Sequence, residues 1–502
     1  YNQGNAPPVI NNYGQTAFQA ELRGVGVTLN NDHGIFTEAG GQLRLIAREG
    51  DAAPGVEPGT VFSQLDNRIP ILSDSGQTVF TARVARPVSI SPFEEAIYAE
   101  SSGTLNLVAL SGQAPTGTPT HMVYTDFGTP TQNASGHIAF RANLSGSGFG
   151  EGIFSGSPGN INTVAYSGMS VPGLGPGEIF YSFNDPAFNS RGQTAFWAIL
   201  SGGTINFDTE VGLFTESTGE LRLFAQSGTP APLLGTGVNF SYLDEQILID
   251  SGHNVFGAGL YGTGINSNND YALFREHEGE YEVLVQTGSQ APGAEPGVVF
   301  AKPDPTTPLP VVVNANGQVA FLAELAGPDV TFINDTGLFA TDSDGNLRLI
   351  ARTGDTFDID AAPDATDLQV ISHIDMVSGS GGGDGRPTSL NDEGQLAFQL
   401  AFRRGQSGIF LASLMATLLG DYSGNGIVDA ADYTVWADNF GSTTNLAADG
   451  NGDGVVDAAD YTIWADNFGS SNTSAITTVP EPAAGLFALW CLSLITQRRS
   501  RR

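Results

Sequence analysis

The stretch NNYGQTAFQAEL, residues 11–22, contains the phrase that organises most of this chain. Its Asn and Gly predict a side-chain-capped turn in which the Gly takes a positive φ. The residues after the Gly alternate between apolar and polar, which is the pattern of a strand with one buried face. The phrase therefore predicts a tight turn that leads into a half-buried β-strand.

The phrase occurs seven times, and its glycines are separated by 62, 60, 56, 60, 65 and 77 residues. The copies are NNYGQTAF (11–18), SDSGQTVF (73–80), NASGHIAF (133–140), NSRGQTAF (189–196), IDSGHNVF (249–256), NANGQVAF (314–321) and NDEGQLAF (391–398). A short phrase such as GIF (34–36) follows each copy, and after six of these comes a third phrase such as LRLIAREGDAAPG (43–55). A fourth apolar run, such as TVFSQLDNRIPIL (60–72), precedes the next copy. Each unit therefore predicts about four strands.

A single four-stranded sheet cannot bury both of its apolar faces, but a ring of such sheets buries them against one another. We therefore expect a mainly β chain in which residues 1–414 form a seven-bladed β-propeller. A six-bladed ring and a linear β array are the alternatives. The seventh unit stops after GIFLASL (408–414), so APPVI (6–10) is a candidate to close the ring. The segment SGSGGGDG (378–385) has the composition of a flexible insertion.

The recurring phrase resembles the NxxGxxAF tandem-repeat family of bacterial surface proteins. The resemblance covers about residues 1–414, and Ser73 and Ile249 depart from it at the Asn position. It implies a location at the cell surface and adds little about activity.

Composition limits the classes of partner. The chain carries 53 acidic and 20 basic residues, a net charge of −33, which argues against binding to nucleic acid because phosphates would be repelled. The single cysteine, Cys491, excludes an intrachain disulfide. The sequence begins at Tyr1 without a recognisable signal peptide, so we expect that a leader was removed or that the sequence is a fragment.

The repeats contain no firm catalytic motif. The six histidines are scattered, and neither a metalloprotease HExxH nor a Gly-x-Ser-x-Gly elbow occurs. Acidic residues are abundant, so a carboxylate pair for glycoside cleavage stays open, but no pair stands out. The phenylalanines of the repeated phrases are spaced as core residues.

An aspartate ladder is written twice near the end of the chain, in residues 421–432 and 449–460. A twelve-residue Ca²⁺ loop supplies oxygens from positions 1, 3, 5, 7, 9 and 12 and turns at a Gly in position 6. The first copy offers Asp421, Ser423, Asn425, the carbonyl of Ile427, Asp429 and Asp432. The second offers Asp449, Asn451, Asp453, the carbonyl of Val455, Asp457 and Asp460. We expect two bound Ca²⁺ ions, with the tighter site in the second copy because it has four carboxylates against three.

A helix pattern follows each loop, and residues 419–470 resemble a type I dockerin. The resemblance implies a calcium-folded module of two antiparallel helices that docks onto a cohesin-like protein. Dockerins usually recognise cohesin through Ser/Thr pairs, where this chain has Ala430–Ala431 and Ala458–Ala459. The usual basic pair is replaced by Asp438–Asn439 and Asp466–Asn467. The resemblance to dockerins therefore supports calcium binding more strongly than it supports docking onto a standard cohesin.

The last 24 residues, VPEPAAGLFALWCLSLITQRRSRR (479–502), resemble a PEP-CTERM sorting signal, with Pro480, Glu481 and Pro482 as the recognition element. The resemblance implies processing by an exosortase and delivery to the envelope, surface or extracellular matrix of a Gram-negative-type bacterium. The apolar segment 483–495 is short for an ordinary membrane span, so we expect only transient insertion as a helix.

These patterns divide the chain into a β-repeat domain (1–414), a dockerin-like calcium domain (415–470), a linker (471–478) and a sorting segment (479–502). We expect an exported, non-catalytic binding and display protein whose repeat domain binds a polysaccharide or a protein. The alternative is a carbohydrate-active enzyme resembling an O-glycosyl hydrolase, which rests only on the association of dockerins with polysaccharide degradation. A buried pair of carboxylates in a pocket would favour the enzyme.

Overall fold

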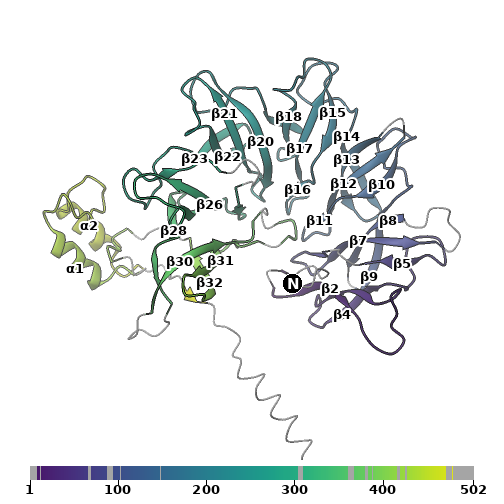
Figure 1. Ribbon diagram of the computed structural model, residues 1–502, viewed down its shortest axis with the longest axis horizontal. Helices are drawn as coiled ribbons and strands as arrows, with labels where there is room; N and C mark the ends of the chain where they lie inside the picture. The colour runs from purple at the N-terminus through teal and green to yellow at the C-terminus, as the bar shows by residue number, and fades with distance from the viewer. Residues whose placement is uncertain are drawn as a thin grey trace, which may run out of the picture. The chain divides into compact units, whose positions relative to one another are not determined.

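The chain is mainly β, as predicted, and the described residues form two helices, α1 (Ala430–Asn439) and α2 (Ala458–Asn467). In this computed structural model (Figure 1), the described residues are 8–11, 13–65, 69–86, 94–101, 103–146, 149–303, 309–359, 367–378, 383–386, 388–414, 419–423, 427–470 and 477–478.

The described strands form seven antiparallel sheets of four or five strands, which confirms the predicted four-stranded repeat. The first three sheets contain β1 (Val9–Ile10), β2 (Thr16–Glu21), β3 (His33–Thr37) and β4 (Arg44–Arg48); β5 (Val61–Gln64), β6 (Ile71–Leu72), β7 (Thr78–Ala85), β8 (Glu94–Ser101) and β9 (Thr104–Leu110); and β10 (Val123–Phe127), β11 (Thr131–Gln132), β12 (Ile138–Ser145), β13 (Phe149–Ser157) and β14 (Asn160–Tyr166).

The next three sheets contain β15 (Ile179–Phe183), β16 (Ala187–Phe188), β17 (Thr194–Ser201), β18 (Val211–Thr215) and β19 (Arg222–Gln226); β20 (Val238–Leu248), β21 (Asn254–Gly262), β22 (Tyr271–His277) and β23 (Glu280–Gln286); and β24 (Val299–Phe300), β25 (Val311–Val313), β26 (Val319–Ala326), β27 (Thr336–Thr341) and β28 (Leu347–Arg352). The seventh contains β29 (Thr356–Asp358), β30 (Leu368–Asp375), β31 (Gln395–Phe402), β32 (Ser407–Ser413) and β33 (Thr477–Thr478).

The fourth run of each unit pairs with the phrase strand of the next unit rather than with its own. For example, β5 and β6 both pair with β7, so each sheet combines two sequence units. The candidate N-terminal strand follows the same rule: β1 pairs with β2 in the first sheet and not with the seventh. The outer edge of the seventh sheet is instead occupied by β33, which pairs with β32 and lies in the expected linker.

The chain forms two compact units, one of Tyr1–Leu349 with Val377–Gly394 and one of Ile350–Met376 with Gln395–Arg502. In the first unit, successive sheets follow one another around Figure 1 and share apolar clusters. One such cluster joins Phe180 and Phe196 of the fourth sheet to Ile153 of the third. The apolar faces are therefore buried between neighbouring sheets, as the repeat pattern requires.

A pair of stacked rings lies in each of the seven described sheets. The ring of the phrase Phe faces the ring of the GIF-type phrase on the paired strand, at centroid distances of 5.3 to 6.2 Å. In the fourth sheet these are Phe196 and Phe214, which are opposite one another in register and almost fully buried. A Cβ on Gly212 would lie 2.8 Å from the Phe214 ring, which explains the Gly of GIF.

The Asn of the repeated phrase bonds to the next repeat as well as to its own turn. The Oδ1 of Asn189 accepts from the backbone N–H groups of Arg191 and Gln193, and its Nδ2 donates to the carbonyl of Ile249, 60 residues away. Asn11, Asn133 and Asn314 make corresponding bonds to Ser73, Asn189 and Asn391. Ser73 and Ile249 lack the amide, so they cannot extend this series.

The described part of the glycine-rich insertion contacts other segments of the first unit. The backbone N–H of Gln132 donates to the carbonyl of Asp384. A Cβ on Gly383 would lie 2.5 Å from Oδ1 of Asp250, and a Cβ on Gly385 would lie 2.7 Å from the Ile71 side chain. Composition predicted flexibility, whereas these glycines permit a close approach of two backbones.

Candidate functional sites

The two helices form a reciprocal pair. The indole N–H of Trp436 on α1 donates to the carbonyl of Asp457, and that of Trp464 on α2 donates to the carbonyl of Asp429. Each accepting residue is the N-cap of the other helix, and each helix begins with a capping box. The duplicated sequence thus produces a duplicated contact in which each helix holds the start of the other.

The second aspartate loop is organised around two inward-facing carboxylates. Oδ1 of Asp460 accepts from the N–H groups of Gly450 and Asn451, and Oδ2 accepts from Asp457. The Asp449 carboxylate accepts from the N–H groups of Asp453 and Gly454. Hydrogen bonds within the loop therefore connect five of its candidate ligands, namely Asp449, Asn451, Asp453, Asp457 and Asp460.

The first loop repeats the described part of this arrangement. Asp432 is fully buried and accepts from the N–H groups of Ser423 and Asp429, and the Ser423 hydroxyl lies 3.4 Å from Oδ1 of Asp421. Burial acts to raise the pKa of Asp432, but the amide donors outweigh it and the pKa is lowered. Asn425 lies outside the described residues.

The apolar residue after each carbonyl ligand anchors its loop. Ile427 and Val455 are partly exposed, whereas the following Val428 and Val456 are fully buried. The N–H of Val428 donates to the carbonyl of Ser470, and that of Val456 donates to the carbonyl of Ser442. Each loop is therefore tied to the residues that follow the opposite helix.

The described acidic residues converge more closely elsewhere. Asp32, His33 and Glu49 place their ligand atoms within 4.8 Å of one another, and no group of three loop carboxylates among the described residues meets that limit. The His33 Nδ1 lies 3.1 Å from Asp32 and 3.5 Å from Glu49, and Glu49 also accepts from the Leu65 N–H. These contacts give the cluster of Asp32, His33 and Glu49 a structural role, which is to link neighbouring strands.

The expected sorting residues Pro480, Glu481 and Pro482 and the apolar segment 483–495 lie outside the described residues. Within the described part of the chain, neither helix has the length and apolar character needed to cross a membrane.

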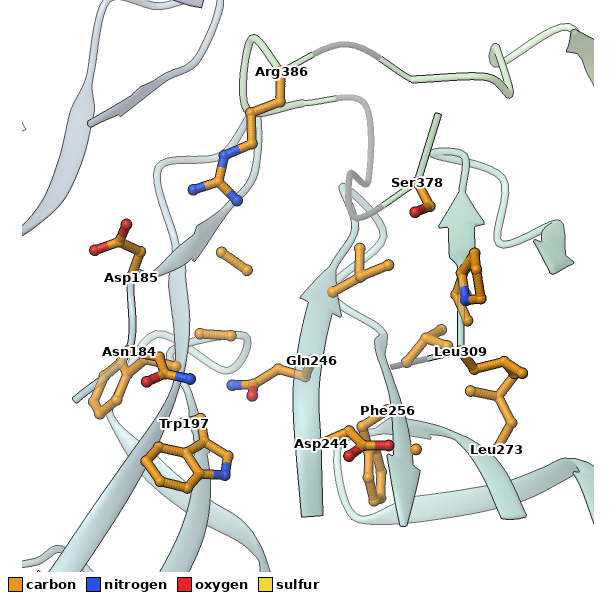
Figure 2. Close-up of a pocket in the computed structure, with 18 of the residues that line it drawn as sticks. Asn184, Asp185, Trp197, Asp244, Gln246, Phe256, Leu273, Leu309, Ser378 and Arg386 are labelled. Carbon is orange, nitrogen blue, oxygen red and sulfur yellow. The ribbon is translucent and has the colours of Figure 1, made fainter. Parts of the chain in front are cut away.

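A cavity of about 390 Å³ lies within the first unit (Figure 2). In the fourth sheet, Asn184 and Asp185 fill the bend between β15 and β16. In the fifth sheet, β20 continues through the corresponding place with a register shift between Leu243 and Gln246, and Asp244 and Gln246 line the cavity. Two neighbouring repeats therefore contribute polar groups from equivalent positions.

Gln246 has an unused acceptor at this cavity. The residue is 7% exposed and its Nε2 donates to the Phe214 carbonyl, but the buried Oε1 has no hydrogen-bond partner among the described residues. Figure 2 shows its amide directed across the cavity toward Asn184. An unpaired buried oxygen costs free energy, so this acceptor favours a ligand donor.

Asp244 is a partly buried carboxylate of the cavity. Its Oδ2 accepts a 2.8 Å hydrogen bond from the Tyr271 hydroxyl. Burial raises the pKa of Asp244, although this bond opposes the shift, and burial together with Asp244 raises the pKa of Tyr271. A Cβ on Gly257 would meet both groups, so the Gly provides the room for the pair.

An adjoining hollow is lined by charged side chains, of which Asp185 and Arg386 also line the cavity. Arg141 is paired with Glu151 at 3.0 Å and with Asp185 at 3.1 Å. Arg386 enters from the segment above the cavity in Figure 2. Its ion pair among the described residues is a 3.7 Å contact between its Nε and Asp384.

Sequence analysis missed this cavity because its polar residues lie at the variable end of the fourth run, between recognisable phrases. The available signal was the difference among GTPTQ (128–132), NDPAF (184–188) and DEQIL (244–248) at one place in the repeat. Those differences become meaningful only once neighbouring sheets bring the bends together.

Replacing Asp244 by Asn is expected to relieve the cost of burying a charge. The pKa of Asp244 is higher in the folded state than in the unfolded state, so folding favours the protonated carboxyl. Asp244 therefore destabilises the folded state increasingly as the pH rises from below its unfolded pKa to above its folded pKa. We therefore expect the melting temperature of Asp244→Asn minus that of the parent to be larger at pH 8 than at pH 4. A pH-independent difference would contradict this explanation.

Comparisons with known proteins add a family and several distant structures. The model of a family of unknown function (DUF7453) matches residues 3–417. No curated protein matches the chain. Similar solved structures include a puromycin hydrolase, with 11% identity and a TM-score of 0.37, covering 81% of this chain and 51% of that one. The chain thus spans about half of that hydrolase.

Two further structures have similar scores. The β-propeller domain of the Trilobed protease from Pyrococcus furiosus has 8% identity and a TM-score of 0.36, covering 81% of this chain and 94% of that one. An ulvan lyase of polysaccharide lyase family PL25 has 8% identity and a TM-score of 0.32, covering 82% and 91%. Since one fold hosts unrelated activities, these likenesses carry no functional argument.

Proposed function

This chain belongs to the DUF7453 family, whose function is unknown, and we propose that it is an exported display protein with a calcium-dependent docking module. The observation that carries the proposal is the reciprocal loop–helix pair, in which Trp436 and Trp464 each bind the N-cap residue of the other helix. A Ca²⁺ ion in either loop would therefore order both helices.

The donor set of the loops fits Ca²⁺, which prefers carboxylate, amide and carbonyl oxygens. In the second loop, Asp449 and Asp460 already accept from backbone N–H groups of the same turn, so the loop is curved around its acidic side chains. A bound cation would neutralise carboxylates that otherwise repel one another. We assign the ion to the ligands predicted from the sequence, including Asn425 in the first loop.

The remaining parts extend this proposal. The seven described sheets would be the blades of a seven-bladed propeller that presents a binding surface. The Pro480, Glu481 and Pro482 element would direct exosortase processing and place the protein at the surface or in the matrix. The partner would dock onto the paired helices as a cohesin does. Because alanines stand at the recognition positions, its contacts would differ from those of a standard cohesin.

Calcium titration of the full chain, after removal of metals with a chelator, tests the module. We expect two bound ions by calorimetry and a rise in helical circular dichroism, with the tighter site in the second loop. The control is the same titration with Mg²⁺, which prefers smaller octahedral sites and should bind more weakly. The absence of Ca²⁺ binding would remove the proposed docking function.

A second function, cleavage of a polysaccharide, is favoured by one observation. Asp244 is a partly buried carboxyl with a raised pKa, which is the property of a general acid. The other carboxylate of the cavity, Asp185, is ion-paired with Arg141, so it is not held as a free nucleophile or base. This asymmetry makes binding the first proposal, and release of reducing ends from acidic or neutral polysaccharides would be the test of cleavage.

A further inference from the structure

We propose that the cavity of the first unit binds an acidic saccharide, with the hydroxyl groups of the sugar at Gln246 and Asp244 and its anionic group at Arg386. The inference concerns a site separate from the calcium loops and does not depend on the docking function. It rests on an unpaired buried acceptor, an arginine positioned by a clamped backbone, and a polar and aromatic lining.

Gln246 indicates that the ligand carries a hydrogen-bond donor. Its Nε2 is committed to the Phe214 carbonyl, so the amide cannot rotate to satisfy its Oε1 without losing that bond. The Oε1 is buried and unpartnered, and its side chain lines the cavity. A hydroxyl group supplies the missing donor, and Asp244, whose Oδ2 already accepts from Tyr271, provides a second polar contact nearby.

Arg386 indicates that the ligand carries an anion. The segment before it is pinned by the Gln132 bond to Asp384, and the Arg386 backbone N–H donates to Oδ1 of Asp384. Gly385 has a φ of +72°, which directs the chain closely past Ile71. The guanidinium of Arg386 lies 3.7 Å from Asp384, beyond hydrogen-bond distance, so its donor groups suit a carboxylate or sulfate.

The other charged side chains of the adjoining hollow do not compete for this role. Both oxygens of Asp185 are engaged, by Arg141 and by the Thr129 N–H, and those of Glu151 by Arg141 and the Phe183 N–H. Arg141 is therefore engaged by these two carboxylates. Arg386 is thus the cation of the lining that is best placed to pair with a ligand.

The size and the aromatic wall of the cavity suit a sugar ring. Its volume, about 390 Å³, lies within the range of small-molecule sites. The Trp197 indole N–H donates to the Leu243 carbonyl, which fixes the ring at the wall. An adjoining hollow of about 620 Å³ shares Asn184, Asp185 and Arg386 with the cavity, so a neighbouring sugar of a chain has room there.

An array of oligosaccharides tests the assignment with the full chain. It should contain uronate oligomers, sulfated galactose oligomers, and neutral galactose and glucose oligomers of matched length. We expect retention of uronate or sulfated members over neutral ones, and the two acidic sets distinguish carboxylate from sulfate. Calorimetry with the best acidic oligomer should then show about 10- to 100-fold weaker binding to Arg386→Gln, because a charge-assisted pair is lost.

Matched variants separate binding from folding. Arg23→Gln removes an exposed arginine of the same unit that pairs with Glu21, and should bind like the parent. Gln246→Leu should weaken every acidic oligomer that the parent binds, while melting curves confirm that each variant is folded. Equal retention of neutral and acidic oligomers, no retention of any, or unchanged affinity in folded Arg386→Gln would overturn the proposal.

Discussion

Replacing Asp460 with Ala is expected to reduce the number of bound Ca²⁺ ions from two to one and to loosen α2. The carboxylate is fully buried and accepts from the N–H groups of Gly450, Asn451 and Asp457. Its removal deletes the proposed last ligand of the loop and the capping box of α2, at a cost of about 2–4 kcal/mol. Calorimetry gives the stoichiometry, and circular dichroism gives the helix content.

The matched control is Asp466→Ala, which removes an exposed aspartate from the same helix. It should leave two ions bound and change the stability by no more than about 0.5 kcal/mol. Asp432→Ala makes the corresponding change in the first loop, where the carboxylate accepts from Ser423 and Asp429. If Asp460→Ala still bound two ions with unchanged helix content, the ligand assignment at position 12 would be wrong.

Replacing Asn189 with Ala is expected to destabilise the first unit by about 2–4 kcal/mol, which is large for one polar side chain. The side chain is fully buried, caps its own turn through Arg191 and Gln193, and donates to the carbonyl of Ile249 in the next repeat. Alanine would leave these backbone groups unpaired in the interior. Thermal and urea unfolding, followed by circular dichroism and tryptophan fluorescence, would measure the loss.

Asn206→Ala is the control for the loss of a turn cap without a bond between repeats. Asn206 lies in an exposed turn, where its Oδ1 accepts from the N–H of Asp208. Water can replace that acceptor, so the expected cost is about 1 kcal/mol or less. Similar destabilisation by the two variants would show that the link from Asn189 to Ile249 contributes nothing beyond local capping.

Much of the β architecture could be predicted because its signals are local. The turn at Gly192 needs a positive φ, and the run after it alternates, so the phrase specifies a turn and a strand without knowledge of the partner strands. The same holds for the helices after Asp429 and Asp457, whose capping boxes occupy positions near each N-terminus in sequence. The two calcium ligand sets were proposed from spacing alone, and their occupancy stays a prediction.

Other features depend on residues that are distant in sequence. Pairing of β1 with β2, and of β33 with β32, is decided by which sheet edge is available, and a two-residue strand carries too little pattern to choose one. Glycine composition likewise does not show that Gly383 and Gly385 lie against other segments of chain.

By itself, the sequence determined the repeat, its turns and strands, and the doubled acidic loops, since backbone conformation and side-chain alternation are set within a few residues. Only the tertiary structure decided that Asn189 reaches Ile249 and that Gln246, Asp244 and Arg386 line one cavity. The physical reason is that an unpaired buried acceptor or a cavity has no local signature. An unpaired buried acceptor and a cavity both arise only when sheets pack face to face, because that packing determines which polar groups water can still reach.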